Sequence, residues 1–194
     1  MNGRNEEVIM ELEVKILDIG IDDIRRLMKE NKASLVKNEM QNNYIYDFDD
    51  RRLLQDRGYA RIRVVTDSTS SKVTVFMTTK RLVSADVYKR MEEHETVIEN
   101  REAGEGIFQA LGLQLIQVIN KSRESYRYKD SLIEIDVNEK EFVPFPYLEV
   151  ESPNEEELKE VVELLGYTME ETSSLSIYDI LKERGLTSST PSES

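Results

Sequence analysis

Six segments of the chain alternate apolar and charged positions with a period of two. In the first, apolar residues occupy positions 12, 14 and 16, and charged residues occupy positions 11, 13 and 15. The same alternation recurs in the segments 58–65, 71–80, 118–123, 132–137 and 147–151. Successive side chains of a strand point to opposite faces, so each segment predicts a strand with one apolar and one charged face.

Four other segments place apolar residues at helical spacing: 20–31, 103–113, 152–167 and 173–185. The first has an Asp as its predicted cap. The third has Ser152 as its predicted N-cap, Pro153 at the first helical position and Gly166 as its stop. Helices that cover the apolar face of a sheet make an α+β fold.

The composition narrows the class of protein. The 194 residues fit one domain, which we expect over 1–186, followed by a polar, disordered tail over 187–194. The absence of cysteine excludes disulfides and thiolate metal sites, and the lone His94 is expected to be a surface residue. We find no apolar run long enough to cross a membrane, so we expect a cytoplasmic protein without a membrane partner.

The net charge of -13 argues against a nucleic-acid partner, but it leaves room for an anion in a locally basic pocket. The charged faces of the six strands carry six acids and six bases. The acids are Glu11, Glu13, Glu134, Asp136, Glu149 and Glu151, and the bases are Lys15, Arg61, Arg63, Lys80, Lys121 and Arg123. The acids gather in the first and the last two strands, whereas the middle strands carry mostly bases.

Two arrangements of these faces are open. In an open sheet they are solvated and cross-linked by surface ion pairs. In a sheet that curls into a barrel they line the lumen. A lumen of this kind suits a metal-bridged triphosphate, because carboxylates favour Mg²⁺ or Mn²⁺, while arginine and lysine grip phosphoryl oxygens.

The order of these motifs resembles the CYTH superfamily of triphosphate tunnel metalloenzymes, which includes class IV adenylate cyclases, thiamine triphosphatases and inorganic triphosphatases. The matching stretches are ELEVK at 11–15, QNNYIYDFDD at 41–50, GYARIRV at 58–64, TTK at 78–80, NKSRESY at 120–126, IEID at 133–136, YLEVE at 147–151 and SIYDIL at 176–181. The resemblance implies an antiparallel, closed or nearly closed eight-stranded β-barrel with its helices packed outside.

The resemblance also implies roles for the charged residues. Mg²⁺ or Mn²⁺ would be bound by Glu11, Glu13, Glu149 and Glu151, supported by Asp136 or Glu134. The triphosphate would be held by Lys15, Arg61, Arg63, Lys80, Arg90, Lys121 and Arg123. Lys15 and Lys121 are the candidate catalytic residues, because a lysine beside other cations can serve as a general base.

Two details stay open. In the strand over 88–98, either Arg90, Glu92 and His94 or Met91, Glu93 and Glu95 reach the lumen, and we favour the set with Arg90 and Glu92. Tyr44 and Tyr46 are candidates for a hydroxyl in the lumen, or for packing beneath the first helix.

The predicted function is metal-dependent hydrolysis of a triphosphate-containing small molecule, whether nucleoside, thiamine or inorganic triphosphate, by a monomer or homodimer. The first alternative is a class IV-type adenylate cyclase that makes cyclic AMP and pyrophosphate. The second is a non-catalytic module that binds polyphosphate or nucleotides.

Overall fold

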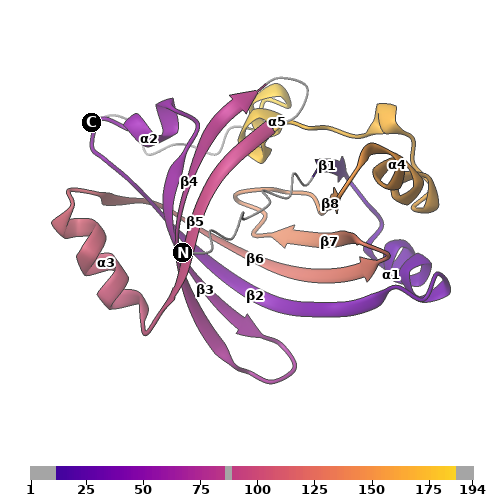
Figure 1. Ribbon diagram of the computed structural model, residues 1–194, viewed down its shortest axis with the longest axis horizontal. Coiled ribbons are helices and arrows are strands. Elements are labelled where there is room, and N and C mark those ends of the chain that lie inside the picture. The colour runs from indigo at the N-terminus through magenta and orange to yellow at the C-terminus, as the bar shows by residue number, and fades with distance from the viewer. Residues whose placement is uncertain (1–11, 86–88, 187–194) are drawn as a thin grey trace, which may run out of the picture.

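The computed structural model describes residues 12–85 and 89–186, with side chains except for 82–85 and 89–91. Within these residues the fold is α+β, as predicted, with an eight-stranded antiparallel sheet, five α-helices and one 3-10 helix (Figure 1). The strands are β1 (Leu12–Leu17), β2 (Ser34–Asp47), β3 (Tyr59–Asp67), β4 (Val73–Ala85), β5 (Lys89–Ile98), β6 (Gln114–Tyr128), β7 (Ser131–Asn138) and β8 (Tyr147–Ser152). The helices are α1 (Ile21–Glu30), α2 (Arg52–Gln55), α3 (Arg101–Ala110), α4 (Glu155–Leu164), the 3-10 helix Met169–Glu171 and α5 (Ile177–Glu183).

The strands follow the order β1-β8-β7-β6-β2-β3-β4-β5, and every neighbouring pair is antiparallel. The long strands bend, so the sheet curls around an interior (Figure 1). Over the described residues no hydrogen bonds join the two outermost strands, β1 and β5, so the sheet is curled but is not closed by its own pairing. Instead, Ser173 pairs with the free edge of β1 through Lys15, with N···O distances of 2.7 and 2.9 Å.

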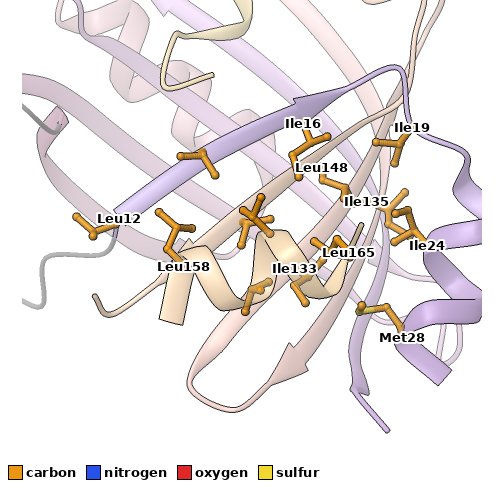
Figure 2. Packing of buried hydrophobic residues seen from close by; sticks show 14 residues of the cluster. Leu12, Ile16, Ile19, Ile24, Met28, Ile133, Ile135, Leu148, Leu158 and Leu165 are labelled. Atoms are coloured by element: carbon orange, nitrogen blue, oxygen red, sulfur yellow. The ribbon is translucent and has the colours of Figure 1, made fainter. Parts of the chain in front are cut away.

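The larger core lies on the outer face of β1, β7 and β8. Ile133, Ile135 and Leu148 are no more than 2% exposed, and they pack against residues of α1 and α4 such as Met28 and Leu158 (Figure 2). Burying one such side chain contributes roughly 1.5–3 kcal/mol relative to leaving it exposed. The apolar half of the alternating pattern therefore faces outward, under helices, and leaves the charged half facing inward.

A second core lies under α3, on the outer face of β3 and its neighbours. Phe108 of α3 packs on Tyr46 with ring centroids 5.1 Å apart. Gly104 lets the helix approach closely, since a Cβ there would lie 2.5 Å from Ile98 Cδ1 and 3.0 Å from Ile62 Cδ1.

Helix boundaries differ from the prediction where a polar residue has another partner. Ser152 ends β8 and its hydroxyl lies 2.7 Å from that of Ser131, so α4 begins after Asn154, whose side chain accepts from the Glu157 N–H. The predicted Ser152 cap is wrong for this reason. The predicted place of Pro153 at the first helical position is wrong too, because that position is Glu155. The predicted Asp cap of α1 is also wrong, because Gly20 is the N-cap and makes no side-chain bond.

The predicted segments left out β2 and α2. Asp47 is the last residue of β2 and is fully buried. Its carboxylate accepts hydrogen bonds from the backbone N–H groups of Phe48 at 2.7 Å, Leu53 at 3.1 Å and Leu54 at 3.0 Å. One carboxylate thus fixes the turn that leads into β3. None of the described helices has both the length and the apolar character needed to span a bilayer.

Candidate active site

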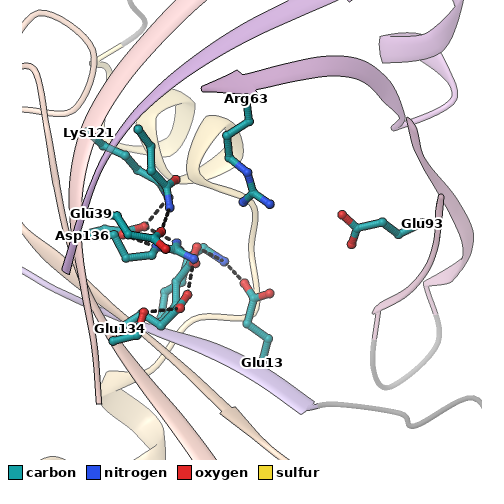
Figure 3. Close-up of polar contacts among 12 residues, drawn as sticks. Glu13, Glu39, Arg63, Glu93, Lys121, Glu134 and Asp136 are labelled. Atoms are coloured by element: carbon teal, nitrogen blue, oxygen red, sulfur yellow. Dashed lines mark hydrogen bonds and ion pairs between the residues drawn. The ribbon is translucent and has the colours of Figure 1, made fainter. Parts of the chain in front are cut away.

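The charged side chains of the alternating strands converge on one interior. Figure 3 shows Glu13, Arg63, Lys121 and Asp136 directed from separate strands toward a shared space, with Glu93 facing them from β5. We call this space the tunnel and the strand face that lines it the inner face. The arrangement is the curled one of the two considered, not the open sheet with a solvated charged face.

Arg123 of β6 is at the centre of the acidic side of the tunnel. Its guanidinium bonds both oxygens of Asp136 at 2.6 Å and Glu149 Oε2 at 2.6 Å, and it also contacts Glu134. Asp136 is 0% and Glu134 2% exposed. Burial disfavours the charge of Arg123, but Asp136 and Glu149 hold its pKa well above its ordinary value.

The two candidate catalytic lysines lie in the same group of residues. Lys121 Nζ donates to Asp136 Oδ2 at 2.6 Å, and Lys15 Nζ contacts Glu13 and lies 3.4 Å from Glu149 Oε1. Burial and the nearby Arg123 lower the pKa of Lys121. Burial also acts on Lys15, but Glu149 and Glu13 outweigh it and raise the Lys15 pKa.

The acids on this side are held in different states. Burial opposes the charge of Glu149, yet Arg123 and Lys15 hold its pKa well below its ordinary value. For Glu134, burial is the dominant influence and raises its pKa, although Arg123 and Ser125 favour its charged form. Glu149 is thus held in its ionised form, whereas burial works against the charged form of Glu134.

The opposite wall, formed by β3, β4 and β5, carries the cationic arc of Arg61, Arg63 and Lys80. Arg63 Nη2 lies 3.0 Å from Glu95, and Lys80 Nζ lies 2.9 Å from Glu93. Arg61 Nη2 lies farther from both acids, at 3.8 Å from Glu93 and 3.6 Å from Glu95.

Positive charge is crowded in the arc, and two of its donors lack partners among the described residues. Burial and the neighbouring Arg61 lower the pKa of Arg63, which shows that positive charge is crowded here. The Nε atoms of Arg61 and Arg63 are buried and have no hydrogen-bond partner among the described residues. A buried donor without a partner lowers the stability of the protein. A ligand with several anionic oxygens would neutralise the crowded positive charge and accept hydrogen bonds from these donors.

The favoured register for the strand over 88–98 was wrong. Glu93 and Glu95 reach the inner face, whereas Glu92 bonds Arg81 on the outer face at 2.6 Å. His94 is a surface residue, as predicted, and lies 3.2 Å from Glu92. Arg90 belongs to β5, but its side chain lies outside the described residues, so its predicted role remains a prediction.

Sequence reasoning also missed inner-face residues of β2. Gln41, 3% exposed, is the register partner of Lys121, and its Oε1 atom is buried without a partner among the described residues. Tyr44 and Tyr46 lie outside the tunnel. The guanidinium carbon of Arg101 in α3 lies 4.8 Å from the centroid of the Tyr44 ring, and Tyr46 packs in the core under α3. The packing alternative holds for both tyrosines, with α3 as the covering helix instead of the first helix.

The predicted metal ligands suit a hard cation by chemistry. Glu13, Glu149 and Glu151 lie across the paired strands β1 and β8, where Glu13 faces Glu151 and Lys15 faces Glu149. Glu11 lies outside the described residues. Among the side chains that are described, no three acids stand close enough to form a ready metal site. Glu149 is paired instead with Lys15 and Arg123. Carboxylate oxygens are ligands that hard divalent cations prefer, but those of Glu13 and Glu149 are ion-paired within the protein.

Comparison with known proteins agrees with this architecture. The structure of PH1819 from Pyrococcus horikoshii OT3 is 21% identical, with a TM-score of 0.72, and covers 90% of this chain and 99% of its own. A Vibrio parahaemolyticus protein described as a candidate adenylate cyclase is 17% identical, with a TM-score of 0.70, over 89% and 97% of the two chains. HpAC1 from Hippeastrum, described with a dominant triphosphatase activity, is 17% identical, with a TM-score of 0.62, over 90% and 96%.

No curated protein matches the sequence. The family model of the CYTH domain matches residues 10–180, which include all eight strands and most of the helices. The chain therefore belongs to the CYTH domain family.

Proposed function

We propose that the protein is an enzyme that hydrolyses a triphosphate in the tunnel, assisted by a divalent cation. The observation that carries the proposal is the cationic arc. Its two guanidinium groups have buried Nε atoms without a hydrogen-bond partner among the described residues, and they face a cluster of carboxylates across one interior. Membership of the CYTH domain family and the triphosphatase activity described for HpAC1 support the same reaction class.

The cationic arc would hold the phosphoryl oxygens. Arg61 and Arg63 offer planar donor pairs and Lys80 a single charged donor, and all three lie on the inner faces of adjacent strands. In phosphoryl transfer the charge spreads over the equatorial oxygens, so fixed cations in a weakly screened site stabilise the transition state. An incoming triphosphate would compete with Glu93 and Glu95 for these cations.

The acidic side would hold the divalent cation through Glu13, Glu149 and Glu151, with Asp136 in support. When bound, such a cation neutralises phosphate charge and polarises the phosphoryl oxygens. In the structure Lys15 pairs with Glu13 and Glu149, Lys121 pairs with Asp136, and Arg123 pairs with Asp136 and Glu149. A triphosphate would draw the same cations toward itself and so release the carboxylates.

Cyclisation of a nucleoside triphosphate is the second candidate. The stretch SIYDIL, which resembles the cyclase-like branch, forms α5 and is capped by the Ser176 side chain, which accepts from the Asp179 N–H at 3.2 Å. Hydrolysis makes fewer demands on the site, because its nucleophile is water and no ribose hydroxyl has to be positioned. We therefore place hydrolysis first.

Product analysis separates the candidates. The purified protein is incubated with ATP, thiamine triphosphate or inorganic triphosphate, each with Mg²⁺ or Mn²⁺. Release of orthophosphate supports hydrolysis. Formation of pyrophosphate and cyclic AMP from ATP would show that the reaction is cyclisation and not hydrolysis. Tight binding of triphosphate without turnover would make the protein a binding module and would contradict the proposal.

A further inference from the structure

Three aromatic side chains from separate segments lie near one another at the end of the tunnel where β3 and β6 begin. They are Tyr59 at the start of β3, Phe142 between β7 and β8, and Tyr178 of α5. We call this group the aromatic end. The Tyr178 hydroxyl donates to Gln117 Oε1 at 2.8 Å. The rings of Phe142 and Tyr178 meet edge to face, with centroids 5.6 Å apart and an interplanar angle of 63°.

The aromatic end adjoins the cationic arc. Tyr59 is the register partner of Lys80, and the Arg61 guanidinium carbon lies 5.6 Å from the Tyr59 ring centroid. Gln117 of β6 and Arg61 of β3 both pair with Ile45 of β2, one from each side. Residues paired across antiparallel strands share a face, so Tyr178 is tied to the same face and the same level as Arg61.

Tyr178 is fixed at its hydroxyl, contacts Phe142 with its ring and remains partly exposed. It is 43% exposed, whereas Ile180 and Leu181 of the same helix are 3% and 2% exposed and pack on Val143 and Phe145. Helix α5 is therefore anchored by its other residues. A tyrosine held by its hydroxyl with free ring surface is a preorganised platform for stacking.

We propose that the aromatic end recognises the planar heterocycle of an organic triphosphate, such as a nucleoside triphosphate, with Tyr178 as a specificity-determining residue. The inference rests on the proposed binding of triphosphate by Arg61 and Lys80, and it adds where the organic part lies. Inorganic triphosphate would engage only the charged walls. The tunnel would thus prefer a triphosphate that carries an aromatic ring over one that does not.

The test compares affinities and does not depend on turnover. Calorimetry in Ca²⁺ measures the dissociation constants of ATP, GTP, CTP, UTP, thiamine triphosphate and inorganic triphosphate for the full chain. We expect at least one ring-bearing triphosphate to bind more tightly than inorganic triphosphate. In Tyr178→Leu that preference falls about tenfold, because base–aromatic stacking is lost. In Tyr178→Phe, which keeps the ring, the preference is retained.

Equal affinity of all six ligands for the wild-type protein would overturn the inference while leaving the proposed function intact. So would a Tyr178→Leu variant that loses affinity for ATP and inorganic triphosphate by the same factor, since that result indicates a structural role only. If inorganic triphosphate itself fails to bind, the proposed function fails together with the inference. Melting temperatures of both variants within a few degrees of wild type confirm that α5 remains packed.

Discussion

At the scale of single residues, the acidic side of the tunnel consists of buried charged groups that are paired with buried groups of opposite charge. Arg123 pairs with three carboxylates, of which Glu134 and Asp136 are almost inaccessible to solvent. Breaking a buried pair by removing one partner is far more costly than its net contribution suggests. The acidic side of the tunnel is consequently part of the fold as well as of the site.

Lys121 offers the sharpest residue-level test of catalysis. Its amino group donates to Asp136 in the tunnel, beside Arg123. In the proposed reaction, a positive charge at this place would stabilise developing negative charge on a phosphoryl oxygen. Lys121→Met should lower kcat for triphosphate hydrolysis by about 10²–10³, the cost of losing one preorganised donor. The dissociation constant for triphosphate should change much less, and steady-state kinetics with calorimetry measures both.

Lys129→Met is the matched control, because Lys129 is exposed and pairs with Glu160 on the surface. Its kcat should equal that of wild type. A Lys121→Met enzyme with unchanged kcat would remove Lys121 from the catalytic residues.

Asp47 provides a residue-level prediction about stability. Asp47→Ala leaves three backbone N–H groups without their acceptor at the turn into β3. Each donor left unsatisfied in a buried site costs about 1–3 kcal/mol, so the midpoint of urea unfolding should fall clearly. Asp49→Ala, at an exposed position in the same turn, should leave it nearly unchanged. An equal fall in the urea midpoint of the two variants would contradict the role of Asp47 in this turn.

At the scale of elements, strands with one apolar and one charged face could be predicted from the sequence, and others could not. In β7, Ile133 and Ile135 alternate with Glu134 and Asp136. This pattern predicts a strand with one apolar and one charged face and leaves no other register. Strand β2 lacks that signal, because 38–43 reads NEMQNN and is polar on both faces. Its place at the centre of the sheet is set by pairing with β3 and β6, which is long-range information.

The β5 register shows the same limit at the site itself. The stretch EEHE at 92–95 puts an acid on each face, so alternation cannot choose between them. Pairing with β4 decides, since Lys80 faces Glu93 and Thr78 faces Glu95 across the ladder, and both pairs bond. The cationic arc was predictable from residue type and spacing, whereas its acidic partners required the register.

The contact of α3 with the sheet gives an element-level prediction. Gly104→Leu would force side-chain atoms into Ile62 and Ile98. Overpacking of this kind costs about 1–3 kcal/mol, so the melting temperature should fall by several degrees. Gly106→Leu, where a Cβ meets nothing within 4 Å, should be neutral or stabilising because leucine favours helix. A Gly104→Leu variant as stable as Gly106→Leu would show that α3 does not depend on this close approach.

At the scale of the whole molecule, the ion-paired tunnel predicts that triphosphate and divalent cation bind cooperatively. Lys15 and Arg123 pair with Glu13 and Glu149 in the structure. In the proposed reaction, triphosphate would attract these cations and free the carboxylates for the metal, and the metal would free the cations for triphosphate. Calorimetry should show that saturating triphosphate raises the affinity for Mg²⁺ by about tenfold or more beyond the binding of Mg²⁺ to triphosphate in solution, and the coupling is reciprocal.

A variant distinguishes this coupling from simple attraction between ligands. Lys15→Met removes the cation that lies between Glu13 and Glu149, so it should raise the affinity for Mg²⁺ in the absence of triphosphate. The coupling factor should shrink accordingly. Unchanged Mg²⁺ affinity in Lys15→Met would contradict the idea that internal ion pairs block the metal site.

The proposed function depends on the binding of triphosphate to the cationic arc on the inner face of the curled sheet. The most direct test is the dissociation constant for inorganic triphosphate with Mg²⁺, measured for wild type, Arg63→Gln and Arg81→Gln. Arg63 lies on the inner face, whereas Arg81 directly follows the inward-facing Lys80 on β4 and bonds Glu92 on the outer face. We predict that Arg63→Gln weakens binding about tenfold or more and that Arg81→Gln leaves it unchanged. Equal effects of the two substitutions, or no binding by wild type, would contradict the binding of triphosphate to the arc.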